Sequence, residues 1–191
     1  MEEWKNELEV SVVAGTLVSG TGTATRSMQG FARFASTLAT AQSGVSLTSD
    51  MLNTFMRTAW SVGKEHDTIL VGGTLKSRIS GFTAGSTKNV DATDKRLVNA
   101  VDVYESDAAR MVKLFAHRYV TVSGDYVTTA TPGFDVLALN EGSWAIAYLS
   151  GREPQTIDLA KTGDADRKEI VTELTLEARA PKSNYYGQLF F

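Results

Sequence analysis

The stretch that decides the fold lies near the end of the chain, at residues 156–179, and reads TIDLAKTGDADRKEIVTELTLEAR. Four apolar side chains of its second half fall on one face of an extended chain: Ile170, Leu174, Leu176 and Ala178. Charged and hydroxyl-bearing residues fall on the other face, and a period of two residues is typical of a half-buried β-strand. We therefore predict a long strand over residues 167–179.

A turn precedes this predicted strand. Asp164-Ala165-Asp166 slightly resembles a calcium-binding loop, but the ligand spacing and the closing glutamate of such a loop are missing. We therefore interpret the segment as a solvated turn. Lys161, Arg167 and Lys168 lie around it, and they are too few to form a nucleic-acid-binding patch.

Toward the N-terminus, strand signals continue as far back as residue 68. Short apolar runs predict strands at 68–71, 97–104, 111–122, 136–139 and 144–149. Gly72-Gly73 leads from the first of these into a short helix at 75–79. The polar stretch 83–95 is predicted to be a loop, and the Thr-rich segment 125–133 a turn region.

Two helices are predicted in the first third of the chain. In residues 2–14, Trp4, Leu8 and Val12 share one face, and Gly15 is a plausible end of the helix. Residues 16–27 are rich in Gly, Ser and Thr, which indicates a flexible loop. Because helices come early and strands later, the order of elements favours an α+β class over alternating βαβ units.

The second helix, near residues 47–61, is the strongest local signal. Thr48, Ser49 and Asp50 supply capping oxygens and a negative charge at its start. Its apolar residues follow helical spacing: Leu52, Phe55, Met56, Ala59 and Trp60. We expect Phe55 and Trp60 to lie in the core, so replacing a buried Trp60 with alanine would cost roughly 3–5 kcal/mol.

Composition excludes several functional classes. The net charge of -3 argues against a strong phosphate-backbone binder, which needs a clear basic excess. The absence of cysteine excludes disulfides, thiolate nucleophiles and cysteine metal sites. No apolar run approaches the roughly 20 residues of a membrane span. The acidic, polar start of the chain is unlike a signal peptide.

Candidate catalytic motifs are weak throughout. The Gly-rich loop at 15–30 and the segment Gly72–Ser77 both lack the full phosphate-binding pattern, so we interpret them as a mobile loop and a helix start. His66 is predicted to lie in a surface turn, and His117 to be a strand side chain that makes a hydrogen bond. The residues offer no convergent set of acid, base and nucleophile, and no cofactor is indicated.

The segment 156–179 resembles the C-terminal signature of the SU10-type major capsid proteins of tailed bacteriophages. In that family an ELAKTGD turn is followed by a basic pair and a strand of the form IVGEYTLEVRN. Other segments agree in their order along the chain: 25–34 (TRSMQGFARF), 47–60, 67–80 (DTILVGGTLKSRIS) and 102–107 (DVYESD). The resemblance covers the chain from about residue 7 to its end.

The resemblance implies an HK97-like fold with a peripheral and an axial domain. On this basis residues 1–27 would form the end of the spine helix and a loop of the peripheral domain. Residues 28–150 would be mostly axial domain, and residues 151–191 would supply peripheral strands and the C-terminus. The chain would begin inside the spine helix, without the N-terminal arm and extended loop that usually precede it.

The resemblance also implies a function. The protein would be a non-enzymatic subunit of an icosahedral viral capsid, assembling into pentamers and hexamers that enclose DNA. Its partners would be other copies of itself, portal or scaffold proteins, and genomic DNA without sequence specificity, but no membrane and no cofactor. It would reside in the virion, and in the host cytoplasm during assembly. We predict a polar intersubunit contact loop containing Ser123, Asp125, Tyr126, Thr128 and Pro132.

Three alternatives stay open at this point. The chain could be the shell protein of a non-viral nanocompartment with the same fold. It could be an enzyme of unrecognised type, with a site assembled from distant residues, or a DNA-binding or tail-associated virion protein. Particle formation by the complete gene product separates the shell proteins from the other classes.

Overall fold

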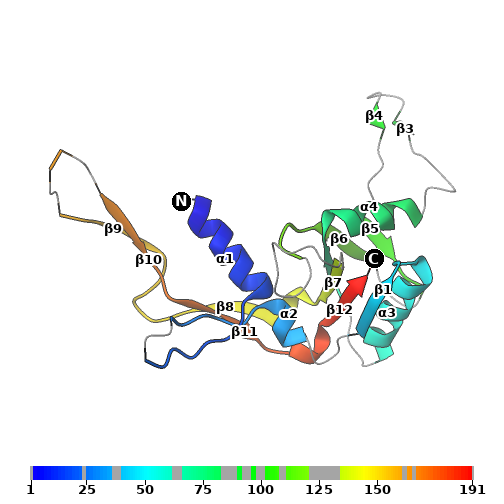
Figure 1. Ribbon diagram of the computed structural model, residues 1–191, viewed down its shortest axis with the longest axis horizontal. Helices are drawn as coiled ribbons and strands as arrows, with labels where there is room; N and C mark the ends of the chain where they lie inside the picture. The colour runs from blue at the N-terminus through cyan, green and yellow to red at the C-terminus, as the bar shows by residue number, and fades with distance from the viewer. Residues whose placement is uncertain are drawn as a thin grey trace.

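The computed structural model describes residues 2–22, 25–35, 40–61, 66–82, 90–91, 96–97, 102–107, 111–120, 134–160, 163–164 and 167–190. They form a mixed sheet flanked by helices and a long two-stranded ribbon that projects away from it (Figure 1). The helices are α1 (Glu2–Ala14), α2 (Phe31–Phe34), α3 (Ser49–Ser61) and α4 (Gly73–Phe82), with short 3-10 turns η2 (Glu141–Ser143) and η3 (Pro181–Ser183). Among the described residues, no helix is long and apolar enough to cross a bilayer.

The strands follow in chain order, and the predicted α+β class is confirmed. They are β1 (Thr40–Val45), β2 (Thr68–Val71), β3 (Val90–Asp91), β4 (Arg96–Leu97), β5 (Val103–Glu105), β6 (Met111–Ala116), β7 (Phe134–Leu139), β8 (Trp144–Tyr148), β9 (Gln155–Asp158), β10 (Lys168–Val171), β11 (Leu174–Ala178) and β12 (Tyr185–Phe190). Six of them build the main sheet in the order β1-β12-β7-β2-β6-β5. β2 runs parallel to β6 and antiparallel to β7, so the sheet is mixed.

The main core lies between one face of this sheet and helices α3 and α4. The sheet supplies buried residues from β2, β6 and β7, including Ile69, Leu114 and Val136. The helices supply Leu52 and Leu75, and all five side chains are almost fully buried. The hydrophobic stripe of α3 and the inward positions of the strands therefore account for this half of the fold.

A smaller core covers the opposite face of the sheet. The short helix α2 and Ala35 pack over Leu137 and Tyr186, which belong to β7 and β12, and Leu70 of β2 joins them. Trp144, at the start of the ribbon, packs edge-on against the Phe31 ring at 4.6 Å between centroids. This second core joins the ribbon to the sheet.

Local sequence signals predicted several elements correctly. The observed helices α1 and α3 and the strand β2 match the predicted ranges closely, and β7 and β8 lie where strands were expected. The expected strand over 111–122 is wrong beyond Ala116, because the chain turns at residues 118–119. The expected strand over 97–104 is also wrong, since β4 and β5 pair in different sheets; residues 98–101 lie outside the described part.

The long strand predicted over residues 167–179 is interrupted. β10 ends at Val171 and β11 begins at Leu174, and the six residues 149–154 of the opposite strand face only two residues here. The surplus forms a tight bulge in which Glu173 N–H donates to Arg152 O and Leu149 N–H donates to Glu173 O, both at 3.0 Å. Such an insertion bends a ribbon without separating its strands.

The predicted burial of Trp60 is wrong. The Trp60 side chain is 54 % exposed, whereas Phe55 is 6 % exposed. Successive helical residues are rotated by about 100°, which puts Trp60 about 90° from the centre of the stripe formed by Leu52, Phe55, Met56 and Ala59. Trp60 therefore lies at the margin of the apolar face and points toward solvent.

The Gly-rich loop after α1 is folded back on itself. Gly30 N–H donates to Gly15 O at 2.9 Å, and Val18 and Ser27 exchange two backbone hydrogen bonds. A Cβ on Gly30 would lie 2.6 Å from Gly15 N, a distance that no side chain can tolerate. The two glycines are thus needed for the close approach of the two ends of the loop.

Candidate intersubunit surfaces and the joint between sheet and ribbon

The proximal part of the ribbon carries an apolar face. Three cross-strand pairs of β8 and β11 lie on it: Trp144–Ala178, Ile146–Leu176 and Tyr148–Leu174. Leu176 is buried, but Ile146 opposite it is 49 % exposed and Tyr148 is similarly open. Half of this face is therefore covered by the protein's own residues and half of it faces solvent.

The distal part of the ribbon is almost entirely exposed. Every residue of β9 is exposed, including Ile157, and Leu159 and Ile170 are also open to solvent. The ion pair between Lys168 and Asp158, at 3.4 Å, is exposed at both ends and adds little stability. A two-stranded ribbon is marginal in water on its own, and exposed apolar groups along one mark a contact surface. The alternation of Ile157 and Leu159 is the sequence signal for β9, although no strand was predicted there.

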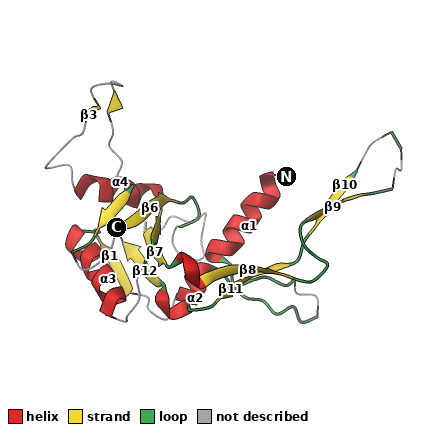
Figure 2. Ribbon diagram, turned by 180° about the vertical axis from the view of Figure 1, so that it is seen from behind, coloured by secondary structure: helices red, strands yellow, loops and turns green. Residues whose placement is uncertain are grey.

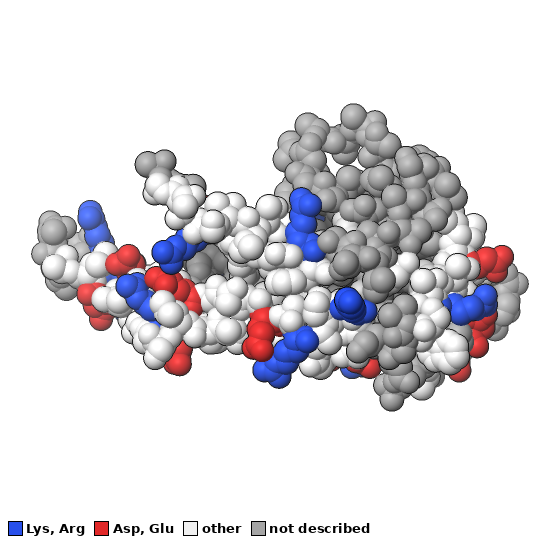
Figure 3. All heavy atoms as spheres, turned by 90° about the horizontal axis from the view of Figure 1, so that it is seen from below, with Lys and Arg blue, Asp and Glu red and all other residues white. Residues whose placement is uncertain are grey.

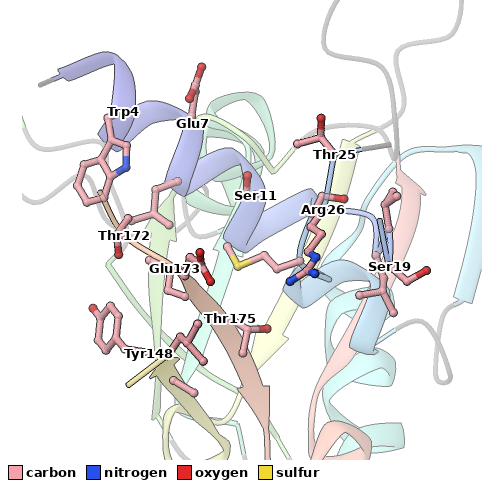
Figure 4. A pocket seen from close by; sticks show the side chains of 18 residues that line it. Trp4, Glu7, Ser11, Ser19, Thr25, Arg26, Tyr148, Thr172, Glu173 and Thr175 are labelled. Atoms are coloured by element: carbon pink, nitrogen blue, oxygen red, sulfur yellow. The ribbon is translucent and has the colours of Figure 1, made fainter. Parts of the chain in front are cut away.

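An open groove of about 1250 Å³ separates α1 from the ribbon. Trp4, Glu7 and Ser11 line it from the helix, while Glu173 and Thr175 face them from β11 and its approach (Figure 4). The loop after α1 closes its end with apolar and hydroxyl-bearing side chains and Arg26. Neither histidine is among the lining residues, which are mainly apolar and hydroxyl-bearing, with Glu7, Glu173 and Arg26 as the charged groups.

The chain crosses between sheet and ribbon twice, and one buried side chain holds both crossings. Asn184 Oδ1 accepts hydrogen bonds from Asn140 N–H and Trp144 Nε1–H, both at 2.9 Å. Asn184 Nδ2 donates to Ala180 O and to Ser143 Oγ, both at 3.1 Å. Asn184 is fully buried, so the amide satisfies groups that solvent cannot reach. No motif in the sequence singled it out.

His66 lies beside this joint, and its predicted location in a surface turn is wrong. The side chain is only 4 % exposed, and among the described residues neither ring nitrogen has a partner in good hydrogen-bond geometry, although the Ser183 backbone lies nearby. Burial lowers its pKa from 6.5 to about 4, partly opposed by the charge of Asp67 and by the nearby Ser183 backbone. The polar residues around His66 suggested a surface, but the central strand β2 begins only two residues later.

The remaining motifs have structural partners. His117 directly follows β6 and accepts a hydrogen bond from Tyr119 N–H at 3.2 Å, so its predicted hydrogen bond is present but just beyond the strand. Partial burial lowers the pKa of His117, against the charge of Glu9. Lys76 in the Gly72–Ser77 segment contacts Asp102 Oδ1 at 2.7 Å, which favours its interpretation as a helix start. Within the described ranges, no cluster of three or more His, Asp or Glu could hold a metal ion.

The predicted contact loop lies outside the described residues. This applies to Ser123, Asp125, Tyr126, Thr128 and Pro132. Asp164 is described and exposed, whereas Asp166 of the same predicted turn is outside the described residues. The loop therefore stays a prediction, and the described surfaces are the ribbon, the groove and the sheet.

The burial of His66 predicts a pH dependence of stability. The unfolded chain takes up the proton near pH 6.5 but the folded protein only near pH 4, so stability is complete above 6.5 and falls as the pH drops toward 4. The total loss should be on the order of 3 kcal/mol. The free energy of unfolding would be measured by urea titration at several pH values between 7 and 4. His66→Phe should remove this part of its decrease with falling pH, whereas the control His117→Asn should retain most of the decrease. An unchanged slope in His66→Phe would contradict the prediction.

Comparison with solved structures identifies the class of fold. The cryo-electron microscopy structure of the holo-SrpI encapsulin complex from Synechococcus elongatus matches with a TM-score of 0.57 at 11 % identity, covering 97 % of this chain and 61 % of that one. The chain therefore has the HK97-like fold of shell proteins and spans about three fifths of the encapsulin's length. The SU10 major capsid protein family matches residues 1–186, and the chain belongs to that family. Comparison with curated proteins gives no match.

Proposed function

We propose that the protein is a structural subunit of an icosahedral viral capsid, which assembles through pentamers and hexamers into a shell around DNA. The observation that carries this proposal is membership of the SU10 major capsid protein family over residues 1–186. The HK97-like fold supports it independently, because the likeness extends over nearly the whole chain at an identity too low to reflect close relationship. The shell would be part of the virion, and assembly would take place in the host cytoplasm.

The described surfaces favour contact with protein over contact with nucleic acid. Apolar side chains are exposed along both parts of the ribbon, at Ile146 and at Ile157. On the face seen in Figure 3, Lys and Arg alternate with Asp and Glu along the ribbon, and neither sign dominates. Any contact with DNA would thus be weak and non-specific. Portal or scaffold proteins are proposed as further virion partners.

We propose a non-enzymatic role. In the part of the chain that the structure describes, His66 is buried, and His117 accepts a hydrogen bond from the backbone N–H of Tyr119. Neither histidine lines the groove between α1 and the ribbon. The family is one of structural proteins, and a purified preparation is expected to show no turnover in a broad activity screen.

The division into domains stays part of the proposal. The helix α1, its following loop and the ribbon would form the peripheral domain, and the six-stranded sheet with its helices the axial domain. The chain crosses between these two parts at residues 140–143 and 180–184, so β8 lies in the ribbon and β12 in the sheet.

A non-viral nanocompartment shell is the second candidate, because a solved structure that matches the fold is an encapsulin. Purified particles separate the two proposals by their content. A capsid subunit should yield particles that package a genome in the presence of the other virion proteins, whereas a nanocompartment shell should enclose protein.

Assembly provides the direct test. The product of the complete gene should form closed particles visible by light scattering and negative-stain microscopy. These 191 residues alone should be monomeric or weakly associated at micromolar concentration, because the exposed apolar patches on the described part of the chain are small. In the complete product, Ile157→Asp should lower the particle yield by about tenfold or more, since it places a charge in a contact surface.

The control is Glu169→Asp, which lies directly opposite Ile157 on the same face and keeps its charge. It should assemble normally. A complete product that stays monomeric under all assembly conditions would refute the proposed function, and shell-sized particles from the 191 residues alone would refute the expectation for the isolated chain.

A further inference from the structure

Part of the main sheet has one face whose side chains are exposed to solvent. α2 and its neighbours cover that face over β7, β12 and β2, through Leu137, Tyr186 and Leu70. The same face continues over β6 and β5, because residues paired across neighbouring strands point to the same side of the sheet. Leu70 pairs with Phe115 of β6, and Met111 of β6 pairs with Glu105 of β5. Beyond β2, the side chains of β6 and β5 on this face are exposed.

The open part of the face is apolar at its centre. We call it the β5–β6 patch, and its outward side chains are Val103, Glu105, Met111, Lys113 and Phe115. Met111 is 69 % exposed, and Val103 and Phe115 are each about half exposed. The residues between them, Tyr104, Val112 and Leu114, point to the opposite face and belong to or pack against the main core. Packing of the opposite face against the main core therefore holds β5 and β6 in place, and the patch is a rigid surface.

The side chains of the patch favour a protein as its partner. A single lysine and a single glutamate flank three apolar side chains, which is unsuited to binding phosphate and resembles the apolar centre and mixed polar rim of a protein interface. The patch is one face of a sheet and is separate from the groove beside α1. β5 has only three residues, and so short an edge favours contact through the face over the addition of a further strand.

We propose that the β5–β6 patch binds a second copy of this chain, as one half of the contact between neighbouring subunits in a ring. The inference rests on the proposed function and adds the location of the contact. A cyclic ring needs two different patches on every subunit, so the β5–β6 patch meets a different surface of its neighbour. Three apolar side chains expose far less than the roughly 800 Å² per partner of a standard stable interface. The contact between two isolated copies is accordingly weak, and closure of the ring strengthens it.

Cysteine labelling tests the location of the contact. The chain contains no cysteine, so each introduced thiol reports one position. Met111→Cys and Val103→Cys would be made in the complete gene product, with Thr74→Cys as the control. Thr74 is exposed on α4, which packs against the opposite face of the sheet. The rate of maleimide labelling would be measured on free subunits and on assembled particles.

We expect assembly to slow the labelling of Met111→Cys and Val103→Cys by about tenfold or more, while Thr74→Cys changes by less than about twofold, since thiol reactivity requires access. Met111→Glu should assemble poorly while its subunits stay folded by circular dichroism. Particles in which Met111→Cys reacts as fast as in free subunits would overturn this inference alone. Normal assembly of Met111→Glu would do the same. A wild-type product that never forms particles would overturn the proposed function, and this inference with it.

Discussion

Replacing Asn184 with alanine is expected to lower the free energy of unfolding by about 3–5 kcal/mol. The change removes the acceptor of the Asn140 N–H and of the Trp144 indole N–H. Ala180 O loses one donor but keeps its hydrogen bond from Ser183 N–H at 2.9 Å. Because Asn184 is fully buried, water cannot replace the lost bonds without opening the joint. Each buried group that loses its partner costs about 1–3 kcal/mol. Urea unfolding followed by circular dichroism measures the loss.

The matched control for this variant is Gln155→Ala. Gln155 is also an amide, but it is exposed on the ribbon and makes a single 3.3 Å hydrogen bond to Gly151 O. Its removal should change the unfolding free energy by no more than about 0.5 kcal/mol. Equal effects of the two substitutions would show that the joint does not depend on Asn184. A fall in the m-value of Asn184→Ala would further indicate that sheet and ribbon no longer unfold together.

Phe55→Ala is expected to cost about 3–5 kcal/mol, and Trp60→Ala about 0.5 kcal/mol or less, although both residues lie on α3. The Phe55 ring packs edge-on against Tyr185 at 4.3 Å between centroids, so its loss opens a cavity between α3 and β12. Trp60 is about half exposed at the margin of the apolar face, so its removal leaves no enclosed cavity.

Circular dichroism is again the suitable probe, since Trp60→Ala also removes a fluorophore. The urea midpoints of Phe55→Ala and Trp60→Ala should differ clearly, while their m-values stay the same. A loss above about 2 kcal/mol in Trp60→Ala would mean that the indole is buried in solution.

Local periodicity was sufficient for elements whose own sequence determines them. Leu52 and Phe55 repeat at helical spacing after the capping Thr48, whose Oγ1 accepts a hydrogen bond from Met51 N–H at 3.3 Å. Likewise, β2 is a short apolar run ended by glycines, and it was predicted with its observed limits.

Elements that depend on partners distant in the chain could not be predicted from the local sequence. β1 reads TAQSGV, which has little β-propensity, and it is a strand because it pairs with β12 at the far end of the chain. The bulge in the ribbon had a local signal, Ser150-Gly151, but its size depends on the opposite strand. The burial of His66 and the role of Asn184 depend on tertiary packing alone. The β5–β6 patch could be recognised only once the covering of the sheet was known.

The strand order of the sheet has a consequence for synthesis. β12 lies between β1 and β7, so these two strands, which precede it in the chain, cannot pair until β12 has been translated. At roughly 5–20 residues per second, the segment from Asn140 to Asn184 takes a few seconds to emerge. During that time the nascent chain presents β7 with one edge unpaired, which is a template for association with other chains. Truncation before Tyr185 would make this condition permanent, so ribosome stalling before this residue should produce insoluble chains rather than partly folded soluble ones.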